Sequence, residues 1–374
     1  MAKNIVVCCD GTSNEYGDCK TNVLKLFSVL PKGDPDQVTF YDPGVGTFSA
    51  PAALTKTTKA VTRVFGLAFG YGITKNIGDA YRFLMDTYEP GDRVYLFGFS
   101  RGAYTARAVA AMIHKCGLLE PGNHNLLPYA LRLFKYERTP RIYAGFKRTF
   151  SRRCDVHFLG VWDTVSSVGW VYDPLTLQFT MTNPIVRTVR HAIAIDERRC
   201  FYRQNLWGKP GRGQDVKQVW FSGAHCNVGG GYEETASGPS QITLEWMIDE
   251  AVRAGLVVDT DRRRLVVPLK PAKPSDDEEF HASPDAAAPL QKSLKGRWWI
   301  AEILPKRFKD PRKNFKTSWR IPLGRRRFIQ EGSTLHGSVV ARIEKTKETD
   351  TPYNPPRLPK SYEVEPWNEG GADE

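Results

Sequence analysis

One serine in the sequence has the surroundings that a hydrolytic nucleophile requires. Ser100 is the middle residue of Gly98-Phe99-Ser100-Arg101-Gly102, which joins an apolar run at 94–97 to an alanine-rich stretch at 102–116. When a strand turns directly into a helix, the corner residue is strained, and side chains two positions away would collide. The pattern therefore predicts a corner that places the Ser100 hydroxyl above a sheet as a nucleophile. A purely structural turn is the alternative.

A nucleophilic serine needs a base, and the sequence offers two candidate histidines. A serine hydroxyl reacts only when a base accepts its proton, and a carboxylate usually orients that base. His225 follows the apolar run 216–221 and precedes the glycines at 229–231, which would let a substrate approach closely. His336 is the alternative because it stands late in the chain, as hydrolase histidines often do. The remaining histidines are better explained as core or surface residues.

The orienting carboxylate is predicted to be Asp163. It directly follows the apolar run 156–161 and Trp162, and the order Ser100, Asp163, His225 is typical of α/β-hydrolases. A role as a turn former or helix cap is the alternative for Asp163. Asp10 competes with it because it also ends an apolar run, but it precedes the serine.

Ester hydrolysis also needs hydrogen-bond donors for the oxyanion. The backbone N–H of Arg101 would lie at the start of the helix that follows Ser100, and Gly11, directly after Asp10, is placed to supply a second N–H. Asp10 could instead bind a metal, but no second cluster of ligands with metal spacing accompanies it. We therefore expect neither a metal nor another cofactor.

Strands and helices alternate along the region that carries these residues. Short strands are predicted from four apolar runs at 4–9, 94–97, 156–161 and 216–221. Helical patterns lie at about 71–88, 102–116, 184–195 and 240–254. Such alternation predicts an α/β fold with a mainly parallel sheet covered on both faces and functional residues at the carboxyl ends of its strands.

The composition changes along the chain and suggests a domain organisation. We expect a catalytic domain at 1–265, with a basic, aromatic helical cap inserted at 122–154. The proline-rich, acidic stretch 266–290 indicates a linker or loop. Residues 291–349 are expected to form a basic C-terminal segment packed on the core, and 350–374 a poorly ordered tail.

The charge and cysteine content restrict partners and compartment. The formal net charge is +12, concentrated between Lys292 and Arg327, which favours phosphate groups on nucleic acid or lipid headgroups, although a solvated face is the plainer explanation. Seven cysteines without a C-x-x-C pair indicate reduced thiols. No signal peptide or membrane span is evident, so we expect synthesis as a soluble cytosolic protein, with export without a cleaved signal left open.

Several motifs together resemble a known family. They are Asp10-Gly11-Thr12 with Asn14, the pentad around Ser100, Gly160-Val161-Trp162-Asp163-Thr164-Val165, and His225 leading into Val228-Gly229-Gly230-Gly231-Tyr232. These stretches resemble the uncharacterised α/β-hydrolase domain family that includes the type VI secretion phospholipase effectors of bacteria. The likeness spans about residues 3–255, with a fainter echo at 325–329 and 335–339.

The resemblance implies an α/β-hydrolase fold, a triad of Ser100, Asp163 and His225, and, for the effector branch, cleavage of phospholipid acyl esters. One departure is visible: Cys226-Asn227 follows the histidine where the family usually has a small polar residue and an aspartate. This departure puts any role of that carboxylate in doubt and leaves the triad untouched.

We therefore expect a serine ester hydrolase that acts on phospholipid or another lipid ester through an acyl-enzyme. The apolar loop 170–181 could hold an acyl chain or pack into the core, and the basic aromatic segments, including Trp298 and Trp299, could touch an anionic membrane or be buried. A secretion or immunity partner is also expected. The alternative is a non-catalytic hydrolase-fold protein that binds nucleic acid or anionic membrane. Nucleic acid is disfavoured because the signatures of common RNA-binding modules are absent.

Overall fold

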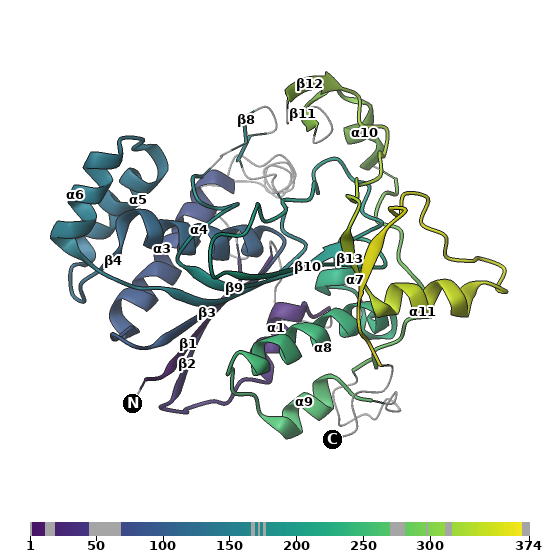
Figure 1. Ribbon diagram of the computed structural model, residues 1–374, viewed down its shortest axis with the longest axis horizontal. Helices are drawn as coiled ribbons and strands as arrows, with labels where there is room; N and C mark the ends of the chain where they lie inside the picture. Colours follow the sequence, from purple (N-terminus) through teal and green to yellow (C-terminus); the bar gives the residue numbers. More distant parts are fainter. Residues whose placement is uncertain are drawn as a thin grey trace, which may run out of the picture.

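The structure is a computed structural model (Figure 1). It describes residues 2–11, 19–44, 69–165, 169–170, 173–174, 177–269, 281–296, 298–310 and 316–368. Thr12 and Asn14 of the first motif, parts of the apolar loop 170–181 and residues 270–280 of the expected linker 266–290 lie outside these ranges.

Eight strands form one sheet in which every neighbouring pair is parallel. The strands are β1 (Asn4–Cys9), β2 (Gln37–Asp42), β3 (Arg93–Phe99), β6 (Val156–Trp162), β9 (Val186–Ala194), β10 (Asp215–Phe221), β13 (Ser333–His336) and β14 (Tyr362–Glu365). Their order across the sheet is β14-β13-β10-β9-β6-β3-β1-β2. The chain runs outward from β1 to β2 and then returns to the other side of β1, so the direction reverses between β1 and β3. Ligands of open parallel sheets bind at such a point, beyond the carboxyl ends of the strands.

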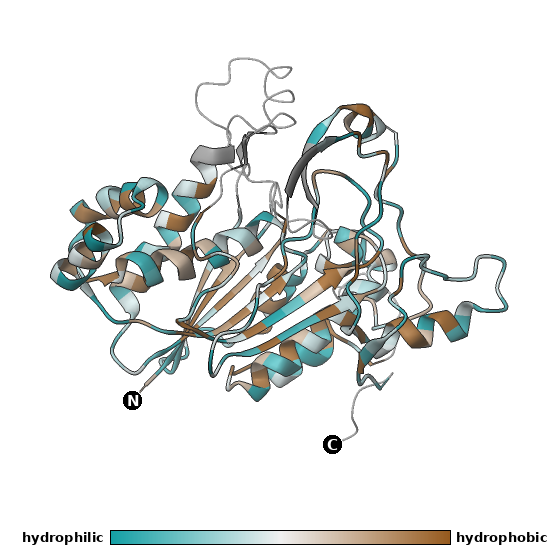
Figure 2. Cartoon of the chain, turned by 45° about the horizontal axis from the view of Figure 1, so that its top comes forward, coloured by the Kyte–Doolittle hydropathy of each residue, from teal (hydrophilic) through white to brown (hydrophobic). Residues whose placement is uncertain are grey.

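Helices cover both faces of this sheet, as the sequence predicts (Figure 1). One face carries α3 (Phe69–Thr87), α4 (Arg101–Cys116), α5 (Leu127–Tyr136) and α6 (Pro140–Phe150), and the other carries α1 (Asn22–Ser28), α8 (Gly238–Arg253) and α9 (Thr260–Val266). Because alternate residues of a strand point to opposite faces, Ile5 and Val7 pack toward α3 and α4, whereas Val6 and Cys8 pack toward α1 and α8. This double burial explains why much of the sheet is apolar; Figure 2 shows hydrophobic residues through the sheet, with hydrophilic residues in some of its strands. The fold is of the α/β-hydrolase type.

The stretch 184–195 was expected to be helical, and that prediction is wrong, because residues 186–194 form β9. Its apolar residues Val186, Val189 and Ile193 recur at intervals of three and four, which imitates a helix. The polar Arg190 between them is buried in the sheet, where it forms ion pairs with Glu250 of α8 and with Asp215. The tertiary partners of Arg190 thus allow a strand where the local pattern indicates a helix.

Part of the region after α9 packs on the central sheet. This region contains α10 (Trp298–Ile303), the antiparallel pair β11 (Lys306–Asp310) and β12 (Lys316–Arg320), the two strands β13 and β14, and α11 (Gly337–Thr346). Ile329, Leu335 and Val339 pack in one cluster with Ile193 and Trp220 of the central sheet. The expectation of a poorly ordered tail is wrong for residues 362–365, which form β14.

The remaining elements are short and connect these layers. They are β4 (Leu118–Leu119), η1 (His124–Leu126), β5 (Ser151–Arg152), β7 (Gly169–Trp170), β8 (Asp173–Pro174), α7 (His225–Gly229) and η2 (Glu234–Ala236). Residues 122–154 are largely helical, as expected, and α5 and α6 pack beside α3 and α4 (Figure 1); a capping role for them stays a prediction. Among the described residues, no helix has the length and apolarity needed to cross a bilayer.

Candidate active site

The corner at Ser100 has the strained geometry that the sequence predicts. Ser100 lies between β3 and α4 with φ 59° and ψ −117°, a backbone conformation that residues other than glycine rarely adopt. A Cβ at Gly98 would lie 2.5 Å from the carbonyl oxygen of Gly102, and a Cβ at Gly102 would lie 2.1 Å from that of Cys9. Both glycines are therefore required for α4 to begin against the ends of β3 and β1.

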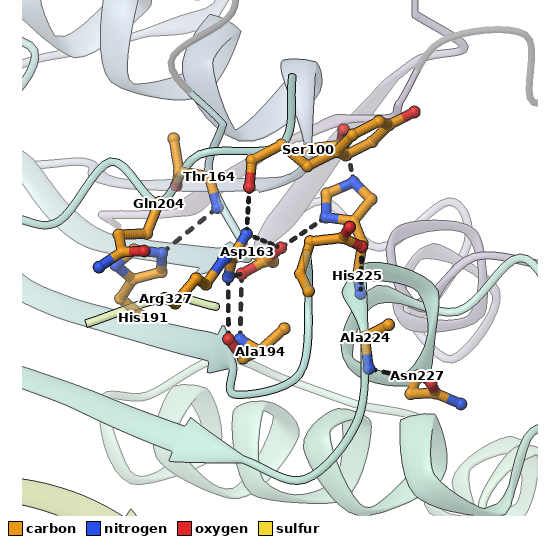
Figure 3. Close-up of polar contacts among 12 residues, drawn as sticks. Ser100, Asp163, Thr164, His191, Ala194, Gln204, Ala224, His225, Asn227 and Arg327 are labelled. Carbon is orange, nitrogen blue, oxygen red and sulfur yellow. Dashed lines mark hydrogen bonds and ion pairs between the residues drawn. The ribbon is translucent and has the colours of Figure 1, made fainter. Parts of the chain in front are cut away.

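His225 reaches Ser100 from the first residue of α7 (Figure 3). Its Nε2 lies 2.8 Å from Ser100 Oγ, and its Nδ1 lies 2.5 Å from Asp163 Oδ2. A carboxylate only accepts hydrogen bonds, so Nδ1 must carry the proton and donate a hydrogen bond to Asp163. Nε2 is then left as an acceptor for the Ser100 hydroxyl, which is the tautomer that a general base needs.

Asp163 is fixed from several directions at the end of β6. Its backbone has a φ of 39°, its N–H donates to Ala192 O (2.7 Å), and its Oδ1 accepts a hydrogen bond from Ala194 N (3.0 Å). Both acceptor and donor belong to β9, the strand beside β6. β9, for which the sequence pattern predicts a helix, therefore holds the Asp163 carboxylate in place.

Burial sets the protonation states of the pair. Burial lowers the pKa of His225 below its usual 6.5, and Asp163 offsets this only in part, so the ring is neutral near pH 7. Burial alone would raise the pKa of Asp163, but the Arg327 guanidinium and the His225 ring outweigh it and hold the pKa below its usual value. The resting site is thus a neutral imidazole next to a carboxylate.

Aromatic rings fix the plane of the His225 ring. Phe99, next to the nucleophile, lies with its ring centroid 4.6 Å from that of His225, and Tyr202 meets it edge-on at the same distance. Ser100 is itself 6% exposed, so the reacting groups are largely shielded from water. Such shielding strengthens the electrostatic interactions on which the pair depends.

The two amides expected to form an oxyanion hole differ in their surroundings and hydrogen bonding. The Arg101 N–H belongs to the first residue of the 16-residue helix α4, where the helix dipole favours negative charge. The Gly11 N–H donates to Asp10 Oδ1 at 2.6 Å. It would have to turn from that oxygen to reach a substrate, so its role stays a prediction.

The alternatives to the triad residues have other places in the structure. His336 caps α11 by accepting a hydrogen bond from Ser338 N, and its ring stacks on Phe221 at 4.5 Å. Asp10 accepts hydrogen bonds from the hydroxyls of Thr21 (2.6 Å) and Tyr41 (2.7 Å), which ties the end of β1 to its neighbours. His225 and Asp163, rather than these two, are the residues that the structure brings to Ser100. Within the described ranges, no three His, Cys, Asp or Glu side chains gather as metal ligands would.

Comparison with protein families finds one family that covers the region containing these residues. Residues 3–250 match the family described as "T6SS, Phospholipase effector Tle1-like, catalytic domain". The chain belongs to this family. The Tle1-like match includes Ser100, Asp163 and His225 and ends within α8.

Individual relatives are longer than this chain. A stretch of 220 residues is 38% identical to "Uncharacterized protein YEL023C" of Saccharomyces cerevisiae and covers 54% of this chain but 32% of that protein. One similar solved structure is an uncharacterized protein from Pseudomonas aeruginosa (19% identity, TM-score 0.42, 71% of this chain and 48% of that one). Another is the Tle1 effector bound to the VgrG spike from the type 6 secretion system (18%, TM-score 0.36, 64% and 52%). The chain thus spans about a third of the yeast relative and about half of each structure.

The structure gives a role to the position at which this chain departs from the usual Tle1-like pattern. Asn227 Oδ1 accepts a hydrogen bond from Ala224 N at 3.0 Å and so holds the turn that leads into His225 (Figure 3). An aspartate oxygen could accept the same bond. The side chain at 227 therefore shapes the turn, and the amide oxygen suffices for that role.

Sequence reasoning missed two charged residues at the site. Glu197 Oε2 accepts a hydrogen bond from the His225 N–H (3.2 Å) and pairs with Arg199. Arg327 contacts Asp163 with both of its terminal nitrogens, although it lies beyond the Tle1-like match. The fainter family echo at 325–329 was the one signal that could have indicated Arg327.

Proposed function

We propose that the protein is a serine ester hydrolase that cleaves acyl esters of phospholipids or related lipids. The observation that carries this proposal is the contact series from Ser100 Oγ to His225 Nε2 (2.8 Å) and from His225 Nδ1 to Asp163 Oδ2 (2.5 Å). It lies at the switch point of a parallel sheet, in a chain that belongs to a phospholipase effector family.

In the proposed mechanism, Ser100 Oγ attacks the ester carbonyl carbon while His225 Nε2 accepts its proton. Asp163 stabilises the imidazolium, and the Arg101 and Gly11 amides bind the oxyanion of the tetrahedral intermediate. The intermediate collapses when His225 returns the proton to the leaving alcohol, which leaves an acyl group on Ser100. A water molecule, deprotonated by His225, then releases the fatty acid and restores the serine.

Exposed side chains beside this site support contact with an anionic lipid surface. Trp299, Ile300 and Ile303 of α10 are all more than 40% exposed. Their neighbour Trp298 packs edge-on against Tyr202 at 5.7 Å, and Tyr202 in turn contacts the His225 ring. Lysines 292 and 295 and Arg325 are exposed in the same region of the chain. Apolar side chains that insert between lipids and cations that attract phosphate are the usual features of a peripheral membrane contact.

The type VI family supports a further proposal about partners. One similar solved structure is the Tle1 effector bound to the VgrG spike from the type 6 secretion system, and export without a cleaved signal and a secretion or immunity partner stay predictions for this chain. The predicted partners are tested by co-purification of this protein with the spike and with neighbouring gene products of the source organism.

Substitution of Ser100 tests the proposed activity. The purified protein, Ser100→Ala, and the exposed control Ser361→Ala are incubated with phospholipids of several headgroups and with nitrophenyl esters of increasing chain length, and products are identified by mass spectrometry. We expect fatty acid release by the wild type and Ser361→Ala, none by Ser100→Ala, and labelling of Ser100 by a fluorophosphonate. Unchanged turnover in Ser100→Ala would defeat the proposal. Salt-sensitive heparin retention without esterase activity would favour a nucleic-acid-binding protein instead.

A further inference from the structure

The Asp163 carboxylate is bound by an arginine from the C-terminal segment. Arg327 Nη1 lies 2.5 Å from Asp163 Oδ1, and Nη2 lies 3.0 Å from Oδ2, so both oxygens are bonded by one guanidinium (Figure 3). Paired parallel bonds of this kind fix the plane of a carboxylate as well as its charge. Arg327 is 6% exposed and Asp163 is fully buried, so solvent screens this ion pair very little.

The guanidinium is itself held in a prepared position. Nη1 also donates to Ala194 O (2.9 Å), and Nη2 also donates to Tyr202 O (2.6 Å). All four terminal N–H groups of Arg327 therefore have an acceptor. A lysine has three donors on one nitrogen and cannot reproduce this arrangement.

The segment that carries Arg327 is docked by the loop between β9 and β10. Arg198 Nε donates to Gly324 O (2.8 Å), and Gln204 Nε2 donates to Phe328 O (3.0 Å). Ile329 completes the docking by packing into the cluster with Ile193. These contacts fix the backbone on both sides of Arg327.

We propose that Arg327 is a positioning residue of the catalytic centre, which holds Asp163 as an oriented carboxylate and makes docking of residues 324–329 a condition for activity. This inference rests on the proposed function, because it assigns Arg327 its effect through Asp163 and His225. It implies that a piece limited to the family match 3–250 would contain the triad without the group that keeps its acid ionised.

The electrostatic reason is the burial of Asp163. Without Arg327, only the His225 ring would oppose the effect of burial, so the pKa of that carboxyl would rise from its present low value, and a protonated Asp163 would accept the hydrogen bond from His225 Nδ1 more weakly. Loss of the nearby positive charge would also favour the imidazolium. The first effect weakens the group that orients the neutral imidazole, and the second removes the neutral imidazole itself, so each disables the proposed base as the pH falls. The other titratable or charged groups around the pair are His191, Glu197, Arg199, Tyr202 and Cys226.

The test compares Arg327→Gln and Arg327→Lys with the control Arg264→Gln, an exposed arginine of α9 that has no place in the proposed site. Turnover is measured from about pH 5 to about pH 10 on the substrate that the wild type cleaves. For Arg327→Gln we expect kcat to fall tenfold or more at neutral pH, KM to stay unchanged, and the acid limb of kcat/KM to move up by about one pH unit or more. Arg327→Lys should show a smaller shift, and Arg264→Gln should match the wild type.

An unshifted acid limb in a folded Arg327→Gln protein would overturn the inference. Circular dichroism and thermal melting establish folding. If Arg327→Gln does not fold, the test uses Arg327→Lys, which keeps the charge. The acid limb of its kcat/KM profile then decides whether Arg327 positions Asp163. If Ser100→Ala retains activity, the proposed function fails, whatever the Arg327 variants do; if Ser100→Ala is inactive and the limb does not move, only the role of Arg327 fails.

Discussion

Ser100 and Arg327 both belong to the proposed catalytic centre, but the chain brings them there in different ways. Ser100 is fixed by its immediate neighbours, since Gly98 and Gly102 are the residues that allow a strand to turn into a helix at that position. Arg327 is fixed by contacts with residues more than 100 positions away, namely Asp163, Ala194 and Tyr202. A local constraint leaves a pattern in the sequence, whereas a distant one leaves only an arginine among many arginines.

The largest effect is expected when each of the two candidate bases is replaced by glutamine in turn. His225→Gln should lower kcat/KM by about 10⁴-fold, because Ser100 then has no group to accept its proton. His336→Gln should leave activity in place and cost on the order of 1 kcal/mol of stability through loss of the α11 cap. Steady-state hydrolysis and thermal unfolding measure the two effects. A folded His336→Gln protein without activity would reverse the assignment.

The local constraint at the corner is tested by adding one methyl group. Gly102→Ala should destabilise the protein by about 3 kcal/mol or more, because the new Cβ would meet the Cys9 carbonyl at 2.1 Å and push α4 away from β1. Gly145→Ala is the matched control. It lies within α6 with no atom near its Cβ position, so the same change should stabilise by about 0.5 to 1 kcal/mol. Equal effects in denaturant unfolding would show that the corner is not tightly packed.

The distant constraint is tested by loosening the anchor beside Arg327. Ile329 is buried in the cluster that joins the C-terminal segment to β9 and β10. Ile329→Ala should cost about 2 kcal/mol of stability through the cavity it leaves. If docking positions Arg327, the acid limb of kcat/KM should also move toward higher pH, by less than in Arg327→Gln. A loss of stability with an unchanged limb would separate packing from catalysis.

The contrast between local and distant constraints also explains what the sequence could predict. The strands that carry Ser100, Asp163 and His225 were foreseen because residues buried on both faces are continuously apolar. β9 was mistaken for a helix because Arg190 and His191 interrupt its apolar run, and the partners that accommodate the arginine, Glu250 and Asp215, come from other elements. β13 and β14 were missed because each is only four residues long and gains its place by pairing with a strand distant in sequence.

The same limit applies to the site residues. The glycine spacing and the order of strand ends indicated Ser100, Asp163 and His225. Glu197 and Arg327 stand in no pattern of their own, and only the fold reveals that one supports the His225 backbone and the other the Asp163 side chain.

The pH profile of the wild type depends on both kinds of constraint. Burial lowers the pKa of His225, so the neutral base persists below the usual 6.5 and is lost only as the pH falls further. We expect kcat/KM to be near its maximum at pH 7 and to decline on the acid side through a pKa below 6.5. A midpoint above that value would show that Asp163 outweighs burial.

The smallest effect is expected at Asn227, where the chain departs from the usual pattern of its family. Asn227→Asp keeps the acceptor for the Ala224 N–H and sacrifices no donor bond, because Asn227 Nδ2 has no hydrogen-bond partner among the described residues. The hydrogen bond to the turn should therefore survive, but Asn227 is buried, so burial of the new carboxylate should cost some stability. The added negative charge next to His225 should favour the imidazolium and move the acid limb upward by less than about one pH unit. Asn227→Ala, which removes the acceptor, is the comparison and should lose stability by about 1 kcal/mol or more. An acid limb that does not move in a folded Asn227→Asp protein would show that a charge at this position does not influence His225.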